Sequence, residues 1–508
     1  MIAKVKFLNI DAGGKPIVVM NADDSKELGI KSSERIWMRY GKKQTIAIAN
    51  IATKSARGYV GVYDEVKNVL GLKEGVEIEI DLAKYPESLE HIKNKLKGRK
   101  LEREDIFEIV RDVIQSRLSE AEIAAFVTNL HDKGMDMGEA ADLSVAMVET
   151  GQKLNFNGKI ICDKHSVGGV PGDKTTLLVV PIIAAAGLTI PKTSSRAITS
   201  AAGTADRAEV LMPVDLEIEE IKDVVNKVGG CIVWGGALHL APADDIFIQV
   251  EYPLSIDPML LPSIMSKKKA VGATHLVIDI PTGRGTKIKT IGDADLLAKD
   301  FIGLGKKLGI ETQCAVTYGE QPIGYSVGSA LEAKEAFEIL TRAKRTPDVI
   351  DKAVNIAGML LEMAGKQNGK ELALDILKSG KAEAKMRQIM EEQGGEIGLK
   401  PEDILIGEHG VDVYADRNGM VMWIDNGTLV DAARKAGSPN DKGAGIALNK
   451  KLGDSVRKGE RLFTVYAEKA PKLERTKKII DENVIMGVGD KMEMLVHTVK
   501  GQFAAKKG

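Results

Sequence analysis

A glycine-rich segment, DKHSVGGVPGDKTT at residues 163–176, constrains this chain more than any other part of the sequence. It follows an apolar run at residues 160–162 and precedes another at residues 177–180, a pattern that predicts a strand, a loop and a helix. Glycine lets backbone amides come close to a ligand, and the first turn of a helix presents unpaired N–H groups. The segment therefore predicts a binding loop for an anion, most commonly a phosphate.

The side chains around these glycines supply further hydrogen-bond donors. They are Lys164, His165, Ser166, Lys174, Thr175 and Thr176. The loop does not fit the Walker pattern, because Asp173 stands where the lysine should be, and it does not fit G-x-G-x-x-G. A glycine-rich turn that merely faces water is the alternative, since such turns are common at the sheet ends of α/β proteins.

A second segment of the same kind begins at Ser194 and reads SSRAITSAAGTADRAEV. It follows another strand-like run, with Leu188 and Ile190, and it gathers small residues, hydroxyl groups and one arginine. In open α/β sheets, ligands bind beyond the carboxyl ends of the strands. Two such loops at successive strand ends can share one ligand, and their combination weakens the alternative of a plain turn.

Composition excludes several classes of protein. Lysine plus arginine (71) nearly balances aspartate plus glutamate (72), which argues against a protein that binds nucleic acid. Cys162, Cys231 and Cys314 show neither C-x-x-C nor zinc spacing, so we expect reduced, buried thiols and no metal site. No apolar run reaches the roughly 18 residues of a membrane helix, and the N-terminus lacks a signal sequence. We therefore expect a cytoplasmic protein without membrane contact.

The 508 residues predict about three domains, because a single core rarely grows beyond about 300 residues. Residues 1–85 alternate like strands and repeat a helix-turn-strand unit, in which Leu28-Gly29-Ile30 matches Leu70-Gly71-Leu72. We expect a small β-rich barrel with an internal duplication there. The region contains no catalytic cluster, which favours a structural or assembly role.

The pattern changes twice more along the chain. Beyond residue 100 apolar residues recur at helical spacing, and Ser119 with Glu122 and Asp136 with Glu139 form the pattern of capping boxes. From residue 160 to about 400, strands rich in isoleucine and valine alternate with helices, which predicts a mostly parallel sheet. Short strands return after about residue 405.

Together, the two glycine-rich segments resemble the signature of the thymidine and pyrimidine nucleoside phosphorylases. The matching residues are KHS-x-GG-V-x-GD-x-T at 164–175, S-x-R-x(6)-GT-x-D-x-x-E at 194–209, EQPIG at 320–324 and VGSALE at 327–332. The resemblance covers roughly residues 86–495. It is closest to the archaeal branch of the family that phosphorolyses AMP, which also carries an extension like residues 1–85.

The resemblance implies an α/β fold with α+β accessory domains, in which a small helical lobe and a large mixed-sheet α/β lobe are separated by a cleft. The N-terminal β-rich duplicated barrel is added to these lobes. The implied domains are the barrel at 1–85, the helical lobe at 86–160 and 242–272, the central phosphate-binding domain at 161–241 and 273–404, and a C-terminal α+β domain at 405–508.

The resemblance also assigns site residues. The phosphate contacts of the family match Lys164, Ser166, Thr176, Ser194 and Thr204. The substrate contacts match Gly169, Ser195, Arg196, Ala197, Ile198, Thr199, Ser200, Thr204, Ser263, Lys267 and Lys287. His165 matches a histidine at the reaction centre, although on the residues alone a hydrogen-bonded loop histidine is an equal alternative.

The base pocket differs from that of the pyrimidine enzymes, which read the base with an arginine, a serine and a lysine. Ser263 and Lys267 have the spacing of the last two, but Ile248 stands in the place of the arginine. Asp257 matches the proton donor of the AMP branch. Adenine leaves most easily when a ring nitrogen is protonated, so we expect Asp257 to be a general acid that partial burial keeps protonated. Alternatively, Asp257 caps a turn before Pro258.

The expected activity is phosphorolysis of nucleoside 5′-monophosphates in nucleotide salvage. AMP and phosphate would give adenine and ribose 1,5-bisphosphate, and CMP and UMP would also be accepted. The surplus of donors favours a nucleotide over a nucleoside, since it exceeds what one phosphate can use. These donors are Ser195, Arg196, Thr199, Ser200 and Lys287. We expect no cofactor besides the co-substrate phosphate, small molecules as the ligands, and a homodimer or larger homo-oligomer.

Three alternatives remain open. A thymidine or pyrimidine nucleoside phosphorylase is opposed by Ile248 and by Pro171, which is inserted relative to that family. A phosphoribosyltransferase of similar architecture needs a magnesium-bound pyrophosphate and a cluster of carboxylates that the sequence does not show. A non-catalytic nucleotide sensor would bind AMP without turnover.

Overall fold

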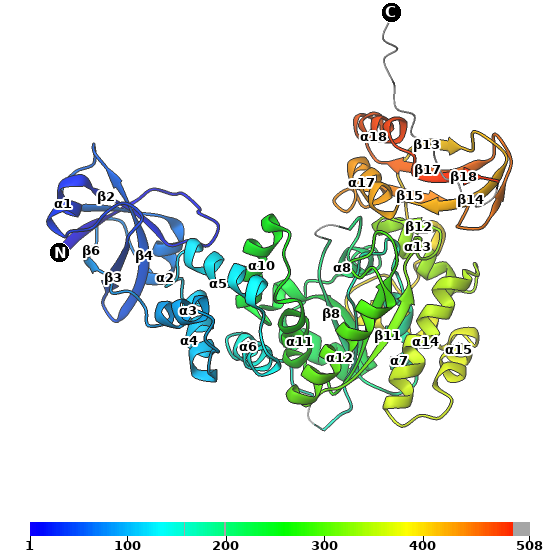
Figure 1. Ribbon diagram of the computed structural model, residues 1–508, viewed down its shortest axis with the longest axis horizontal. Helices are drawn as coiled ribbons and strands as arrows, with labels where there is room; N and C mark the ends of the chain where they lie inside the picture. Colours follow the sequence, from blue (N-terminus) through cyan, green and yellow to red (C-terminus); the bar gives the residue numbers. More distant parts are fainter. Residues whose placement is uncertain (157, 198–199, 491–508) are drawn as a thin grey trace, which may run out of the picture. The chain divides into compact units, whose positions relative to one another are not determined.

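The computed structural model describes residues 1–156, 158–197 and 200–490 (Figure 1). Its internal contacts divide the chain into two compact units. The first consists of Met1–Gln152 with Ala241–Lys267, and the second consists of Lys153–Leu240 with the chain from Lys268 onward. Both units are therefore assembled from segments that are discontinuous in sequence.

The N-terminal part of the first unit is a closed six-stranded barrel, drawn in blue in Figure 1. Its elements are β1 (Ile2–Phe7), β2 (Ile17–Asn21), α1 (Ala22–Glu27), β3 (Arg35–Tyr40), β4 (Lys43–Ala52), β5 (Tyr59–Val62), α2 (Asp64–Leu70) and β6 (Glu77–Leu82). The strands close in the order β1-β5-β2-β4-β3-β6. Alternate side chains point inward, as Ala3 and Val5 of β1 show, so each strand contributes one face to the core. The barrel predicted from the alternation is confirmed.

The strand pairing of the barrel has an internal symmetry. The chain passes through β1, β2, α1 and β3, and then through β4, β5, α2 and β6. In the two halves β1 corresponds to β4, β2 to β5, and β3 to β6. The parallel pair β1–β5 then corresponds to the parallel pair β4–β2, and the antiparallel pair β1–β6 corresponds to the antiparallel pair β4–β3. The repeated Leu-Gly motif follows the helix in both halves. A duplicated unit would give this pattern; the duplication itself stays a prediction.

The rest of the first unit is a helical bundle. Its helices are α3 (Ser88–Leu96), α4 (Arg103–Ile114), α5 (Glu120–Lys133), α6 (Met137–Glu149), α10 (Pro242–Leu254) and α11 (Leu260–Ala270), of which α11 runs across the boundary into the second unit. Both predicted capping boxes are present, with Ser119 and Glu122 at the start of α5 and Asp136 and Glu139 at the start of α6. The buried face of α4 packs with α5, α6 and α10 around one apolar core.

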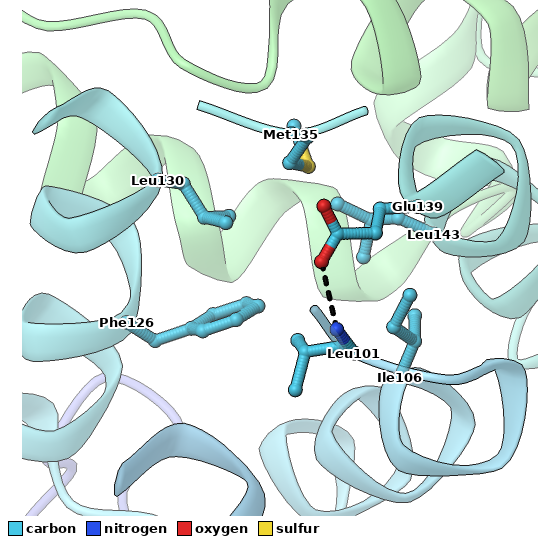
Figure 2. Close-up of a pocket in the computed structure, with 7 residues that line it drawn as sticks. All are labelled: Leu101, Ile106, Phe126, Leu130, Met135, Glu139 and Leu143. Carbon is cyan, nitrogen blue, oxygen red and sulfur yellow. Dashed lines mark hydrogen bonds between the residues drawn. The ribbon is translucent and has the colours of Figure 1, made fainter. Parts of the chain in front are cut away.

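A buried carboxylate ties three parts of the bundle together. Glu139 is 4% exposed and accepts hydrogen bonds from Lys95 Nζ at 2.7 and 2.9 Å, from the Leu101 amide at 2.9 Å and from the Asp136 amide at 3.0 Å. Figure 2 shows its carboxylate beside the apolar side chains of Phe126 and Met135. The cavity among them measures about 10 Å³, which holds at most one water molecule. It is therefore a packing defect and not a ligand site.

The second unit is built on a parallel sheet. Its strands are β7 (Cys162–Ser166), β8 (Ile190–Ser194), β9 (Gly230–Trp234), β10 (His275–Thr282) and β11 (Glu311–Tyr318). The strands β11, β10 and β7 pair in parallel, β8 pairs in parallel with β9, and a parallel bridge between Ile161 and Thr189 joins the two groups. Every pairing described within this sheet is parallel. The mixed sheet predicted for the large lobe is not found among the described residues, because the C-terminal strands form separate antiparallel sheets.

Helices surround this sheet, and a compact antiparallel part follows it. The helices and short turns are α7 (Thr176–Ala185), α8 (Thr204–Ala208), α9 (Ile218–Val228), η1 (Gly235–Leu238), α12 (Ile291–Leu308), α13 (Ser329–Leu340), α14 (Pro347–Met363), α15 (Gly369–Lys378), α16 (Lys381–Glu392), η2 (Pro401–Asp403), α17 (Asn426–Ala436) and α18 (Ala470–Glu482). The remaining strands are β12 (Ser326–Val327), β13 (His409–Tyr414), β14 (Gly419–Ile424), β15 (Gly445–Leu448), β16 (Ser455–Val456), β17 (Arg461–Ala467) and β18 (Met486–Gly489). They form the antiparallel sheets β12-β15-β17-β13 and β16-β14-β18.

The C-terminal sheets share one apolar core with α17 and α18. The strand β12 lies within the range predicted for the central domain, yet it pairs with β15 of the C-terminal part. Within the part of the chain that the structure describes, no helix has the length and apolar character needed to cross a membrane.

The substitution Glu139→Ala is expected to destabilise the helical bundle by about 3–5 kcal/mol, because it leaves the ammonium group of Lys95 buried without its partner. Hydrogen exchange of peptides from α3 to α6, measured by mass spectrometry, reports this loss as faster local opening. The matched control is Glu90→Ala, which removes an exposed partner of Lys93 and should leave exchange unchanged. Equal protection in both variants would show that Glu139 does not hold the bundle.

Candidate active site

The two glycine-rich loops leave the parallel sheet at the same edge. The first follows the carboxyl end of β7 at Ser166, and the second follows the carboxyl end of β8 at Ser194. Because Ile161 and Thr189 form a parallel bridge just before these strands, β7 and β8 run in the same direction side by side. The loops after β10 and β11 emerge at this edge too, since β10 pairs in parallel with both β7 and β11. The edge therefore gathers the loops in the way that a shared ligand requires.

Backbone contacts between loops explain two of the glycines in the first segment. Gly169 has φ of +92°, and a Cβ atom there would lie 2.6 Å from the amide nitrogen of Lys287 in the loop after β10. Gly172 has φ of +79°, and its Cβ would lie 2.5 Å from the carbonyl oxygen of Ile323 in the segment after β11. Side chains at these positions would be strained and would also push the loops apart. The glycines thus hold three loops together at the sheet edge.

The first loop offers two groups suited to an anion. Lys164 is 2% exposed, and its Nζ donates to Thr175 Oγ1 at 3.0 Å. Burial lowers the pKa of Lys164, an effect that the carboxylates of Asp173 and Asp279 partly offset. The Ser166 hydroxyl is buried and has no hydrogen-bond partner among the described residues. A buried hydroxyl without a partner is costly, so a bound anion or water would stabilise it.

The remaining residues predicted for this loop lie close by. Thr176 is buried at the first position of α7, where the helix presents its unpaired amides. His165 is half-buried within β7 and lies opposite Ile278 of β10. Lys287 is exposed in the loop after β10, beside Gly169. The phosphate and substrate roles of these residues stay predictions.

The expectation that Lys174 donates to a ligand is wrong. Its side chain is fully buried, and Nζ donates to Glu335 at 2.8 Å and to the carbonyl oxygens of Ile323 and Ser326 at 2.8 and 3.2 Å. All three partners lie after β11, so Lys174 fastens the first loop to that segment. The sequence shows a lysine in the loop, but it does not show the direction of the side chain, which points toward the segment after β11.

The second loop is organised by two carboxylates of the signature at 194–209, to which the sequence analysis assigned no role. Glu209 binds the guanidinium of Arg196 with two hydrogen bonds of 2.9 and 2.6 Å, and Asp206 accepts from the amides of Ala197 and Gly203 at 2.7 and 2.8 Å. The hydrogen bond with Arg196 lowers the pKa of Glu209 to about 2. The guanidinium also lies over the ring of Trp234, 4.9 Å from its centroid. This geometry favours a role for Arg196 in fixing the loop; its predicted contact with substrate stays a prediction.

The other residues of the second loop are placed as follows. Ser194 is half-buried at the end of β8, and Ser195 is exposed. The Ser200 hydroxyl donates to the carbonyl of Ala202 at 3.2 Å, and the Thr204 hydroxyl accepts from Arg207 at 3.3 Å. The predicted substrate contacts Ile198 and Thr199 lie outside the described residues.

The first unit supplies the residues predicted to handle the base. Ser263 and Lys267 lie one turn apart on α11, and both contact the same carboxylate oxygen of Asp244, at 2.8 and 2.6 Å. Burial alone would lower the pKa of Lys267, but the Asp244 carboxylate outweighs that effect and raises it. Asp244 is fully buried in the first turn of α10. It is the residue of this group that sequence reasoning missed.

Asp257 lies in the turn between α10 and α11, and its side chain is exposed. The partial burial expected for this carboxyl group is therefore not found. The physical reason is local: α10 ends at Leu254, and its C-cap Ser255, with φ of +54°, turns the chain so that Asp257 is exposed while Met259 is buried. Ile248, predicted in place of the base-reading arginine, is half-buried on α10.

The sequence analysis expected reduced, buried cysteines and no metal site. Cys162, Cys231 and Cys314 are free thiols; the first two are buried and Cys314 is only half-buried. Burial raises the pKa of each thiol to about 12. Within residues 1–156, 158–197 and 200–490, no three side chains of the kinds that bind metals come together.

Comparison with known proteins gives consistent matches along the chain. Residues 89–151 match the helical bundle domain of the glycosyl transferase family, and residues 158–383 match the a/b domain of that family. Residues 420–486 match the C-terminal domain of pyrimidine nucleoside phosphorylases. These ranges cover the bundle of the first unit and most of the second unit.

Curated relatives match almost the whole chain. AMP phosphorylase from Thermofilum pendens is 49% identical over 96% of this chain and 95% of its own length. AMP phosphorylase from Pyrococcus furiosus is 48% identical, with 94% of this chain and 95% of the relative covered, and that from Methanocaldococcus jannaschii is 47% identical, with 94% and 96% covered.

Among solved structures, anthranilate phosphoribosyltransferase from Thermus thermophilus shares the fold, with a TM-score of 0.52. It covers 59% of this chain and 98% of its own, at 19% identity. The TM-score shows that the folds are similar. An identity this low carries no information about the reaction.

Replacing Gly169 with alanine is expected to weaken binding of inorganic phosphate at least about tenfold, because the new methyl group would force the first loop away from Lys287. Isothermal titration calorimetry with phosphate measures the change. Gly187→Ala is the matched control, since Gly187 also has a positive φ, +83°, but a Cβ there meets no atom within 4 Å. If both variants bind phosphate as the unmodified protein does, the first loop is not the anion site.

Proposed function

We propose, from the premise that this chain belongs to the AMP phosphorylase family, that it cleaves AMP with inorganic phosphate and releases adenine and ribose 1,5-bisphosphate. The protein is thus a pentosyltransferase. The structural observation that supports the proposal is that the loops after β7 and β8 leave the sheet at one edge, close to the buried Lys164 and the unpartnered hydroxyl of Ser166.

The reaction exchanges one bond at the anomeric carbon for another. The C1′–N9 bond of AMP breaks, a bond forms between C1′ and a phosphate oxygen, and the departing adenine takes up a proton. Amides and hydroxyl groups of the first loop would hold the phosphate beside C1′, which removes the entropic cost of bringing two reactants together. The second loop would hold the ribose and its 5′-phosphate through Ser195, Thr199, Ser200 and Thr204, with Lys287 from the loop after β10.

Asp257 would supply the proton, as the general acid acting on a ring nitrogen of adenine. Ser263 and Lys267 would contact the substrate from α11, and Asp244 would fix both side chains in place.

Several finer points belong to the same proposal. CMP and UMP would be accepted, because the base pocket has no arginine at Ile248 to select a single ring. The chain would need no cofactor besides phosphate and would assemble at least as a homodimer. Its free thiols fit a reducing compartment, so we place the reaction in the cytoplasm.

Incubating the protein with AMP should release adenine only when phosphate or arsenate is present, because the attacking group is the oxyanion and not water. Chromatography of the free base measures the reaction, and uridine and thymidine serve as comparison substrates. Cleavage that proceeds equally well without either oxyanion would indicate hydrolysis. Faster cleavage of uridine than of AMP would favour a pyrimidine nucleoside phosphorylase.

The substitution Asp257→Asn is expected to lower kcat about 10²- to 10⁴-fold with little change in KM for AMP, because it removes the proton but keeps the size of the side chain. Steady-state kinetics at saturating phosphate measure both constants. Asp132→Asn, at an exposed aspartate of α5, is the control and should behave as the unmodified enzyme. An unchanged kcat in Asp257→Asn would remove the acid role.

A further inference from the structure

Four charged side chains form a connected row that begins at Lys164 in the first segment and ends at Asp279 in β10. Lys164 Nζ donates to Thr175 Oγ1 at 3.0 Å, and that hydroxyl donates to Asp173 Oδ1 at 2.5 Å. On its other side, Asp173 Oδ2 lies 3.4 Å from Lys352 Nζ of α14. Lys352 Nζ in turn lies 2.7 Å from Oδ2 of Asp279 in β10. Positive and negative groups alternate along this row, and all four side chains are largely or fully buried.

Asp173 poses an electrostatic problem for an anion site. Its carboxylate belongs to the glycine-rich loop itself and is linked to Lys164 through one hydroxyl group. A buried carboxylate near a bound phosphate repels it, because charges interact strongly where water is excluded. It also competes with the phosphate for the ammonium group of Lys164. Something must neutralise Asp173 if the loop is to accept an anion.

Lys352 is placed to do this. It is 8% exposed and bridges the carboxylates of Asp173 and Asp279, whose other oxygen accepts from Thr317 at 2.6 Å. Burial alone would lower the pKa of Lys352, but the two carboxylates outweigh that effect and raise it, so the side chain stays charged. Burial alone would raise the pKa of Asp173, but Lys164 and Lys352 outweigh that effect and hold it well below its usual value.

We propose that Lys352 is a positioning residue of the phosphate site, which neutralises Asp173 and Asp279 and so leaves the ammonium group of Lys164 for the attacking phosphate. The inference rests on the proposed function, because it assigns the first loop to the co-substrate. It extends the site to α14, a helix that no motif connects with the loop: Lys352 and Asp173 are 179 residues apart in sequence.

The test compares Lys352→Met with variants that separate charge from packing. Lys352→Met should raise the phosphate KM and the phosphate dissociation constant about 10- to 100-fold, since two buried carboxylates lose their counter-charge. The KM for AMP should change little. Lys352→Arg should retain most of the affinity for phosphate, because it keeps the charge. Lys370→Met removes an exposed lysine of α15 that pairs with Asp351, and it should have no effect.

The double variant Lys352→Met with Asp173→Asn provides a rescue. Removing the carboxylate that Lys352 neutralises should return the phosphate KM most of the way to that of the unmodified enzyme, and it should fold even if the single variant does not. Calorimetry with inorganic phosphate alone measures affinity independently of turnover. An unchanged affinity for phosphate in folded Lys352→Met, an equal rise in both KM values, or a failure of the double variant to recover would each overturn the inference. If the unmodified protein binds phosphate but releases no adenine, the proposed function fails while this test still applies.

Discussion

The structure depends on the neutralisation of charges buried at the carboxyl edge of the parallel sheet. Moving an ionised side chain out of water costs several kcal/mol unless a partner of opposite charge and further hydrogen bonds compensate for it. Lys174 is matched with Glu335, and Arg207 is matched with Glu332, each pair almost completely buried. These pairs join segments that are far apart in sequence. The same ion pairs that satisfy buried charge therefore also fix the loops from which the candidate site is built.

One buried carboxylate within the strands that lead to this edge faces two lysines. Asp163 lies 2.8 Å from Lys268 Nζ and 3.6 Å from Lys192 Nζ, and all three side chains are almost inaccessible. A single negative charge cannot fully compensate two positive ones, and burial lowers the pKa of Lys192 to about 7 with a further contribution from Lys268. Asp163 lies in β7 and Lys192 in β8, so this cluster belongs to the two strands that lead into both loops. The strands beneath the candidate site thus contain buried charge as well as apolar side chains.

The sequence predicted those parts of the fold that are set by interactions between residues close together in the chain. The alternation of residues 1–85 predicted the strands, and the Ser119–Glu122 spacing predicted the start of α5, because these local patterns are set within a few residues. The pairing that closes the barrel, by contrast, joins residues as far apart as Ile2 and Glu79. The glycine spacing also predicted a strand, a loop and a helix around residues 163–176. In each case the interactions that set the structure are between near neighbours in the chain.

Patterns of neighbouring residues could not predict which other residues the site residues contact. Asp244 meets Ser263 and Lys267 from a different helix, and nothing in the sequence around it distinguishes it from an ordinary acidic residue in a first helical turn. Lys174 was misassigned because its direction is set by Glu335, which lies 161 residues away. Pairing at such separations follows from the three-dimensional arrangement alone.

The anion-binding loop is formed before any ligand binds, and this bears on the proposed reaction. Lys164 is already buried and held by Thr175. Gly169 and Gly172 allow the loop to pack closely against the segments after β10 and β11. Under the proposed function the attacking phosphate would therefore meet donors that need little rearrangement, so that binding energy serves to position the oxyanion and is not spent on building its site.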